Sequence, residues 1–123
     1  GRGAVSHELI RFIYEIRWIA VNGECPDFFT CHECGREDNL YVYSSSRHGL
    51  CCKNCATNVY DGITLSGSTV YTLQYIVTAQ LNRLYSFTVT KEVQEELRLV
   101  VNRLESIVFD KEFKSKEMLN LTI

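Results

Sequence analysis

Residues 31–55 read CHECGREDNLYVYSSSRHGLCCKNC, and two cysteine pairs in this stretch decide the fold. The first pair is Cys31 and Cys34, and the second, after 17 intervening residues, is Cys52 and Cys55. Each pair places two thiols on one tight turn. Two such turns brought together by a hairpin form a tetrahedral site of four thiolates. The spacing therefore predicts one structural zinc ion.

Disulfides are the main alternative, since six cysteines allow 15 pairings. No export signal or long apolar run is visible, because charged residues interrupt the first apolar stretch, Leu9 to Val21. A cytoplasmic location is therefore expected, where thiols stay reduced and metal binding is favoured. Another metal, and a thioredoxin-like use of one cysteine pair, are the remaining alternatives.

The other cysteines and the histidines are not expected to be metal ligands. Cys51 breaks the two-residue spacing, and strand alternation predicts that it points away from the metal into local packing. Cys25 precedes Pro26 in a loop and is interpreted as a spare thiol. His32 is expected to face solvent inside the first turn, and His48 is expected to be a turn residue.

Segments around the cysteines have clear local signals. Ser6 to Val21 is predicted as a helix capped by Ser6 and ended by Asn22-Gly23. Leu40 to Tyr43 and Leu50-Cys51 are predicted as a hairpin.

The second half of the chain is predicted to be helical. A helix capped by Ser66 or Ser68 carries an apolar face through Leu84, and a third begins after Thr90 with a face through Val108. These faces are interpreted as core, with a groove for a partner peptide as the alternative. Arg98 and Arg103 on the third helix are interpreted as solvent-facing. The tail, residues 110–123, is expected either to dock through its apolar residues or to fray.

Composition limits the possible functions. The chain has 123 residues, 46% of them hydrophobic, which fits one folded domain. Its net charge of -2 would become about -4 with zinc on four thiolates, which is unlike a free-standing nucleic-acid binder. A closed four-sulfur site has no open position for a substrate, and no nucleophile motif, phosphate loop or carboxylate pair is recognisable. A non-enzymatic domain is predicted.

A local patch is the candidate nucleic-acid surface. Arg36, Arg47 and Lys53 cluster in or beside the cysteine module, with Tyr41 and Tyr43 nearby for base stacking. The alternative, which we favour at this point, is that these are ordinary solvated charges and that the tyrosines cover the helices.

The order of these features resembles the C-terminal domain of RecO, the bacterial recombination mediator, from about Leu9 to Leu119. The resemblance depends on a helix followed by these stretches: ECPDF at 24–28, CHECG at 31–35, GLCCKNCA at 49–56 and FKSK at 113–116. It implies that Cys31, Cys34, Cys52 and Cys55 are the zinc cysteines. Cys51 stands where the family usually has an apolar residue, and Cys25 looks additional.

The resemblance also implies a role in the RecF pathway of DNA repair and recombination after DNA damage. Members of the family work with RecR, bind the C-terminal tail of single-strand DNA-binding protein, anneal single-stranded DNA and help to load RecA. They begin with an N-terminal OB-fold, which this chain lacks, so it is expected to be a C-terminal piece. The location implied is the bacterial cytoplasm, at the nucleoid during repair, without membrane contact.

Together these observations predict a mostly α-helical domain over residues 1–123, with a zinc-ribbon-like β-hairpin module at 25–58 inserted into it. Two other functions are kept as alternatives. One is a stand-alone zinc-ribbon module that binds nucleic acid, and the other is a thiol or zinc enzyme.

Overall fold

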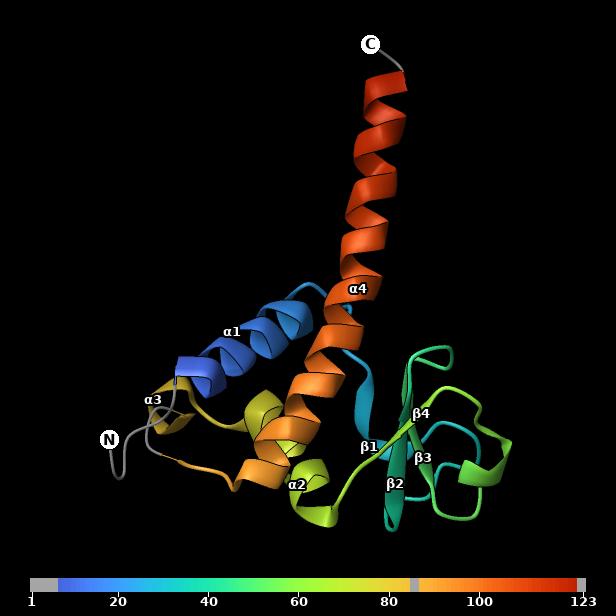
Figure 1. Ribbon diagram of the computed structural model, residues 1–123, viewed down its shortest axis with the longest axis vertical. Coiled ribbons are helices and arrows are strands. Elements are labelled where there is room, and N and C mark those ends of the chain that lie inside the picture. Colours follow the sequence, from blue (N-terminus) through green and yellow to red (C-terminus); the bar gives the residue numbers. More distant parts are fainter. Residues whose placement is uncertain (1–6, 85–86, 122–123) are drawn as a thin grey trace.

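The computed structural model describes residues 7–84 and 87–121, and the side chains among them except those of 58, 81 and 108–121. The elements follow one another as α1 (His7–Val21), β1 (Asp27–Cys31), β2 (Leu40–Ser44), β3 (Gly49–Cys52), η1 (Ala56–Asn58), β4 (Gly62–Thr64), α2 (Gly67–Thr78), α3 (Leu81–Leu84) and α4 (Lys91–Leu121). Figure 1 shows the helices on one side and the strands on the other. Among the described residues no helix has the length and apolarity to cross a membrane.

The first helix ends where the sequence predicts. Gly23 adopts a φ of 74°, and its N–H donates to the carbonyl of Ala20 at 3.1 Å, while the N–H of Glu24 donates to that of Ile19 at 3.0 Å. This is the left-handed C-terminal stop that glycine favours, and it turns the chain toward the strands. The predicted cap, Ser6, lies outside the described residues.

The predicted hairpin is confirmed, but it is the centre of a wider sheet. β2 and β3 pair antiparallel, β1 adds parallel to β3, and β4 adds antiparallel to β2, which gives the order β1-β3-β2-β4. The sequence pattern predicts neither of the outer strands, β1 and β4. Both outer strands are short and depend on pairing with distant residues, so neither has a strong pattern of its own.

The second predicted helix begins as expected. Ser66 is its cap, since its hydroxyl accepts from the N–H of Thr69 at 3.2 Å. Its continuation to Leu84 is wrong, because α2 ends at Thr78 and a separate short helix, α3, follows.

A side chain from α1 forms hydrogen bonds with the backbone at this break. The Nη1 of Arg17 donates to the carbonyls of Ile76 at 3.2 Å and Ala79 at 2.9 Å, which would otherwise be unpaired helix-end acceptors. Ala79 is extended, with ψ at 155°. The charge of Arg17 also suits the negative end of the helix dipole, so a residue 62 positions away stabilises the end of α2.

The last helix begins as predicted at Thr90, whose hydroxyl accepts from the N–H of Val93 at 3.2 Å. Its backbone is helical to Leu121, and its far end extends beyond the body of the molecule (Figure 1). The tail side chains lie outside the described ones, so their docking stays a prediction.

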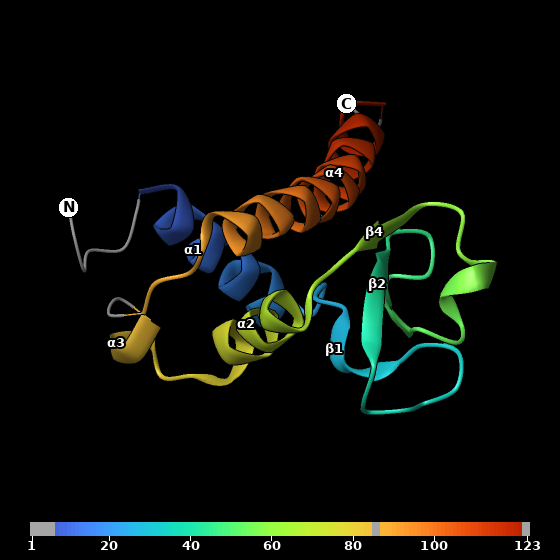
Figure 2. The same ribbon diagram turned by 60° about the horizontal axis from the view of Figure 1, so that its bottom comes forward.

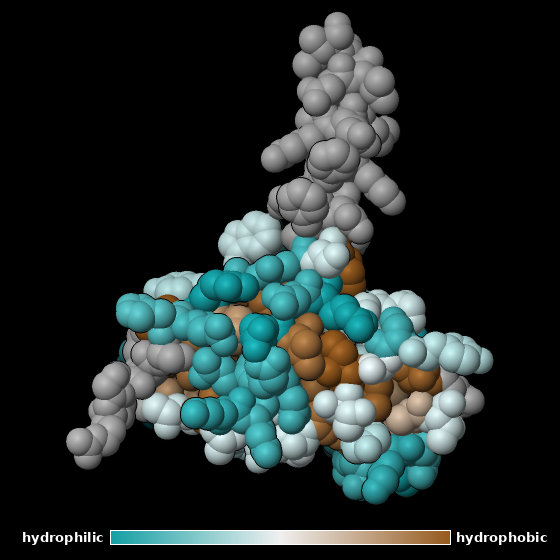
Figure 3. Space-filling view, in the orientation of Figure 1, coloured by the Kyte–Doolittle hydropathy of each residue, from teal (hydrophilic) through white to brown (hydrophobic). Residues whose placement is uncertain are grey.

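One hydrophobic core joins the helices to the sheet, and the predicted helix faces point into it. Figure 2 shows α1, α2 and α4 packed beside one another next to the sheet, and Figure 3 shows hydrophobic surface gathered where α4 meets the strands. Side chains buried completely in this core come from both layers: Phe12, Ile16, Tyr43, Leu50, Leu73, Ile76, Leu97 and Leu104. The helical domain therefore carries the cysteine module on a shared core.

Candidate metal centre

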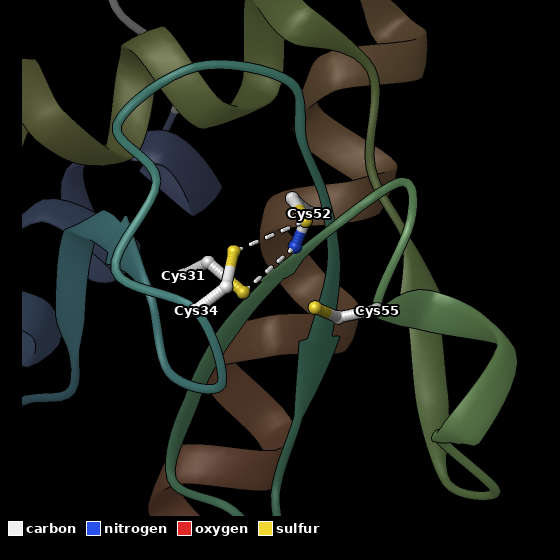
Figure 4. A group of neighbouring side chains, drawn as sticks. All are labelled: Cys31, Cys34, Cys52 and Cys55. Carbon is white, nitrogen blue, oxygen red and sulfur yellow. Dashed lines mark hydrogen bonds between the residues drawn. The ribbon is translucent and has the colours of Figure 1, made fainter.

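Four cysteines meet at one end of the sheet. Cys31 ends β1 and Cys52 ends β3, while Cys34 and Cys55 lie on the turns that follow these strands. The four sulfurs lie within 4.8 Å of one another. Figure 4 shows all four side chains directed toward a common point.

Backbone hydrogen bonds shape both turns. In the first, the N–H of Gly35 donates to the carbonyl of Cys31 at 2.9 Å, and the N–H of Cys31 donates to that of Arg36 at 2.7 Å. Gly35 has a φ of 77°, a conformation that a side chain disfavours. In the second turn, the N–H of Cys55 donates to the carbonyl of Cys52 at 3.1 Å. Each turn thus brings its two thiols to the same side.

The arrangement fits a tetrahedral metal ion. Zinc–sulfur bonds of about 2.3 Å at tetrahedral angles separate the sulfurs by about 3.8 Å. The sulfurs of Cys34 and Cys52 are 3.7 Å apart. The backbone N–H of Cys52 also donates to the sulfur of Cys31 at 3.3 Å, which is a contact that stabilises a thiolate ligand. An all-sulfur donor set is the one that zinc commonly occupies in structural sites.

The thiols also differ in acidity. Burial raises the pKa of Cys31, but hydrogen bonds from the backbone of Cys34 and Cys52 outweigh it and lower that pKa to about 7. The backbone N–H of Cys55 lowers the pKa of Cys52. The hydrogen bond from Cys55 to the Cys52 sulfur, followed by burial, raises the pKa of Cys55 to about 12. Metal binding by these thiols as thiolates would therefore release protons.

The cysteines and histidines that are not expected to bind the metal lie outside this cluster. Cys51 is completely buried in the core, and burial raises the pKa of Cys25 to about 11. His32 is exposed. His48 sits in the hairpin turn with a φ of 53°, and its Nε2–H donates to the carbonyl of Glu24 at 2.6 Å.

The candidate nucleic-acid residues do not form one free basic patch. Arg47 pairs with Glu33, and Arg36 pairs with Asp38 at 3.3 Å. Internal pairing of this kind reduces the charge that each arginine offers to a phosphate.

The two tyrosines expected beside that patch differ in solvent exposure. Tyr43 is completely buried, which agrees with the favoured interpretation that the tyrosines cover the helices, so its ring is not available to stack on a base. Tyr41 is exposed, and the Nζ of Lys53 lies 5.8 Å from the centre of its ring, a cation–π distance. Of the five residues considered for nucleic-acid binding, Tyr41 and Lys53 therefore remain the candidates.

A polar network at the hairpin turn is not predictable from a motif in the sequence. The carboxylate of Asp61 accepts from the hydroxyl of Ser44 at 2.9 Å and from the N–H of Ser46 at 2.8 Å. Arg103 is exposed, as interpreted, and its Nη1 also donates to the hydroxyl of Ser45 at 2.8 Å and to the carbonyl of Asp61 at 3.0 Å. The network ties the hairpin to α4. In the sequence, the run of serines and Asp61, which comes later in the chain, were the only signal of this network.

Comparison with known proteins gives one consistent relationship. The family model described as "Recombination protein O C terminal" matches residues 2–117. A DNA repair protein RecO from Thermoanaerobacter sp. (strain X514) is 26% identical over 107 residues, which is 87% of this chain and 43% of the relative. One from Clostridium perfringens (strain 13 / Type A) is 29% identical over 117 residues, 94% of this chain and 47% of the relative.

The same name belongs to a protein of Caldanaerobacter subterraneus subsp. tengcongensis that is 27% identical over 113 residues, 92% of this chain and 46% of the relative. No solved structure matches the chain. The chain spans about half the length of the curated relatives it matches. With a family match over nearly all of its residues and a four-cysteine cluster between its helices, the chain belongs to the RecO family, in the region of the recombination protein O C-terminal domain.

Proposed function

We propose that this chain is a zinc-stabilised domain of a DNA repair and recombination mediator, and that it contributes contacts with proteins and weak contacts with single-stranded DNA. The family match over residues 2–117 is the observation that carries the proposal. The family is named for recombination and the relatives for DNA repair, and neither name is that of an enzyme. This agrees with the prediction that the domain is non-enzymatic.

The zinc ion is proposed to be single and structural, held by Cys31, Cys34, Cys52 and Cys55. Four sulfurs close the tetrahedron, so the ion would act by joining β1 and β3 rather than by polarising a substrate. The module at 25–58 would then be an insert in a helical domain over residues 1–123.

The proposed partners are RecR, the C-terminal tail of single-strand DNA-binding protein and single-stranded DNA. The proposed outcome is strand annealing and RecA loading. The relatives are bacterial proteins, which supports a place in the bacterial cytoplasm, at the nucleoid during repair. Arg36, Arg47 and Lys53 are the proposed DNA contacts, with Lys53 favoured because the two arginines pair with acids of the chain.

Metal content tests the first part of the proposal. Elemental analysis of the purified chain is expected to give one zinc per chain, released as four thiols react with a blocking reagent. Chain that contains disulfides and no metal would contradict the zinc assignment.

Partner binding tests the second part. The zinc-loaded chain is expected to bind purified RecR, or a fluorescent peptide with the tail sequence of single-strand DNA-binding protein, in a titration followed by anisotropy. A peptide of the same composition in scrambled order is the control. Failure to bind both partners would contradict the mediator role of this domain.

A stand-alone nucleic-acid module is the second candidate, and the placement of Lys53 over Tyr41 favours it. Such a module is expected to bind DNA tightly by itself with steep salt dependence. Binding only in the presence of RecR would favour the mediator instead.

A further inference from the structure

Tyr41 lies at an irregularity in β2. Leu40 pairs with Cys52 and Val42 pairs with Cys51, so two steps along β2 match one step along β3. Tyr41 is the extra residue of this bulge, and a bulge of this kind re-aims a side chain. The ring of Tyr41 is exposed, while both of its neighbours in the strand are buried.

The surroundings of Tyr41 are fixed by backbone hydrogen bonds. Its carbonyl accepts from the N–H of Leu65 at 2.8 Å, and the carbonyl of Asn39 accepts from the N–H of Lys53 at 2.9 Å. Lys53 follows Cys52 directly, so the same turn that carries a candidate metal ligand holds the ammonium over the ring. The backbone that carries the two side chains is therefore held in place in the folded chain.

A hollow lies on each side of this pair. One, of about 470 Å³, opens between the sheet and the start of α2 and is lined by Tyr71. The other, of about 420 Å³, opens beside η1 and β4 and is lined by Tyr60. Tyr41 and Lys53 line both hollows. Tyr60 is fully exposed and Tyr71 is 69% exposed, and Tyr41 shares one hollow with each of them, so the three tyrosines line two adjoining hollows.

The charges of this surface favour rings over phosphates as the contents of the hollows. Among the described residues that line the hollows, Lys53 is the one cation, and Glu37 lines the hollow beside Tyr71. A carboxylate repels phosphate, whereas planar bases gain from aromatic faces whatever their sequence. A strand with its bases turned toward the protein places its phosphates away from Glu37.

We propose that Tyr71, Tyr41 and Tyr60 form a stacking platform for the unpaired bases of a single-stranded nucleic acid, with Lys53 beside the central ring. This inference rests on the proposed DNA contact and changes its nature, from phosphate binding by Arg36 and Arg47 to stacking of bases on tyrosines. The platform discriminates single strands from duplexes, because paired bases keep their faces covered.

Direct titration of the zinc-loaded full chain with a fluorescent single-stranded DNA tests the platform. Y60A and Y71A are each expected to weaken binding about 5- to 100-fold, the range of one lost base stack. In both tyrosine variants the slope of log Kd against log salt concentration should equal that of the wild-type chain, because no charge is lost. K53A should reduce this slope.

The matched control is Y14A, since Tyr14 is a comparably exposed tyrosine (53%) on α1, away from both hollows. An abasic strand of equal length is the control ligand and should bind more weakly than the normal strand. Equal affinity for both strands, or equal binding by the wild-type chain, Y60A and Y71A, overturns the platform.

The outcomes also separate this inference from the proposed function. If the chain binds RecR or the tail peptide but no single-stranded DNA, the platform is overturned and the mediator role stands. If Y60A and Y71A lose partner binding while keeping DNA binding, the surface is a protein interface and the platform is again overturned. If both protein partners fail to bind and the tyrosine variants lose DNA binding, the platform stands without the mediator role.

Discussion

The backbone N–H of Cys52 donates to the sulfur of Cys31 across 3.3 Å, and this contact joins the ends of two parallel strands at the candidate metal centre. The two residues are 21 positions apart in the sequence. A metal ion on the four sulfurs would stabilise the same junction, since structural zinc binding contributes directly to folding free energy.

Replacement of Cys34 or Cys55 by serine is therefore expected to destabilise the chain by several kcal/mol and to lower the melting temperature markedly. Circular dichroism melts with and without a chelator measure the effect. The control is Cys25→Ser, which changes a cysteine outside the cluster. If the C34S variant melts like the wild-type chain, the zinc is not structural.

The carboxylate of Asp61 is expected to make stability depend on acid pH. The backbone N–H of Ser46, and next to it the hydroxyl of Ser44, lower the pKa of Asp61 from 3.8 to about 2, against the opposing effect of burial. The folded chain thus binds fewer protons than the unfolded chain between these values. The contribution is complete above about pH 4 and is lost as the pH falls toward 2.

Urea unfolding of D61N at pH 7 and pH 3 measures this contribution. The variant is expected to be less stable than the wild-type chain by about 1–3 kcal/mol at pH 7, and by less at pH 3. Comparison of the two proteins at each pH removes the effect of acid on the cysteines. D38N, which alters only an exposed ion pair, is the control. An equal difference at both pH values contradicts the lowered pKa.

The guanidinium of Arg17 is expected to stabilise the end of α2. R17A leaves the carbonyls of Ile76 and Ala79 without this donor and should cost about 1.5–3 kcal/mol, the range for hydrogen bonds to charged groups. R17K should recover part of the loss. Chemical denaturation measures both, with R98A as a control, because the carboxylate partners of Arg98 are exposed and such pairs are worth about 1 kcal/mol or less.

Two glycines form a matched pair for the packing of β4. A Cβ on Gly62 would lie 2.4 Å from Cγ1 of Val42, so G62A should destabilise the chain by about 1–3 kcal/mol. A Cβ on Gly67, the first residue of α2, meets nothing within 4 Å. G67A should therefore be neutral or slightly stabilising. Thermal melts compare the two variants, and equal effects would contradict the close contact between β2 and β4.

Local chemistry made several features predictable from the sequence. The two cysteine turns, the glycine stop after α1 and the caps at Ser66 and Thr90 each depend on bonds between residues three to five positions apart. The periodic helix faces are equally local, because helix geometry alone places residues three and four apart on one side. The amino-acid sequence by itself therefore determined where α1 ends, where α2 and α4 begin, the hairpin and the four candidate ligands.

Tertiary structure decided the rest. The break after α2 coincides with bonds from Arg17, the pairing of Arg47 with Glu33 depends on the first turn folding toward the hairpin, and the network of Asp61 reaches α4. Bonds over such separations leave no repeating pattern in the sequence. The burial of Tyr43 and the exposure of Tyr41 could not be decided from the sequence for a related reason. One extra residue in β2 changes which face of the sheet the following side chains take. Only the pairing of β2 with β3 shows that β2 contains this extra residue.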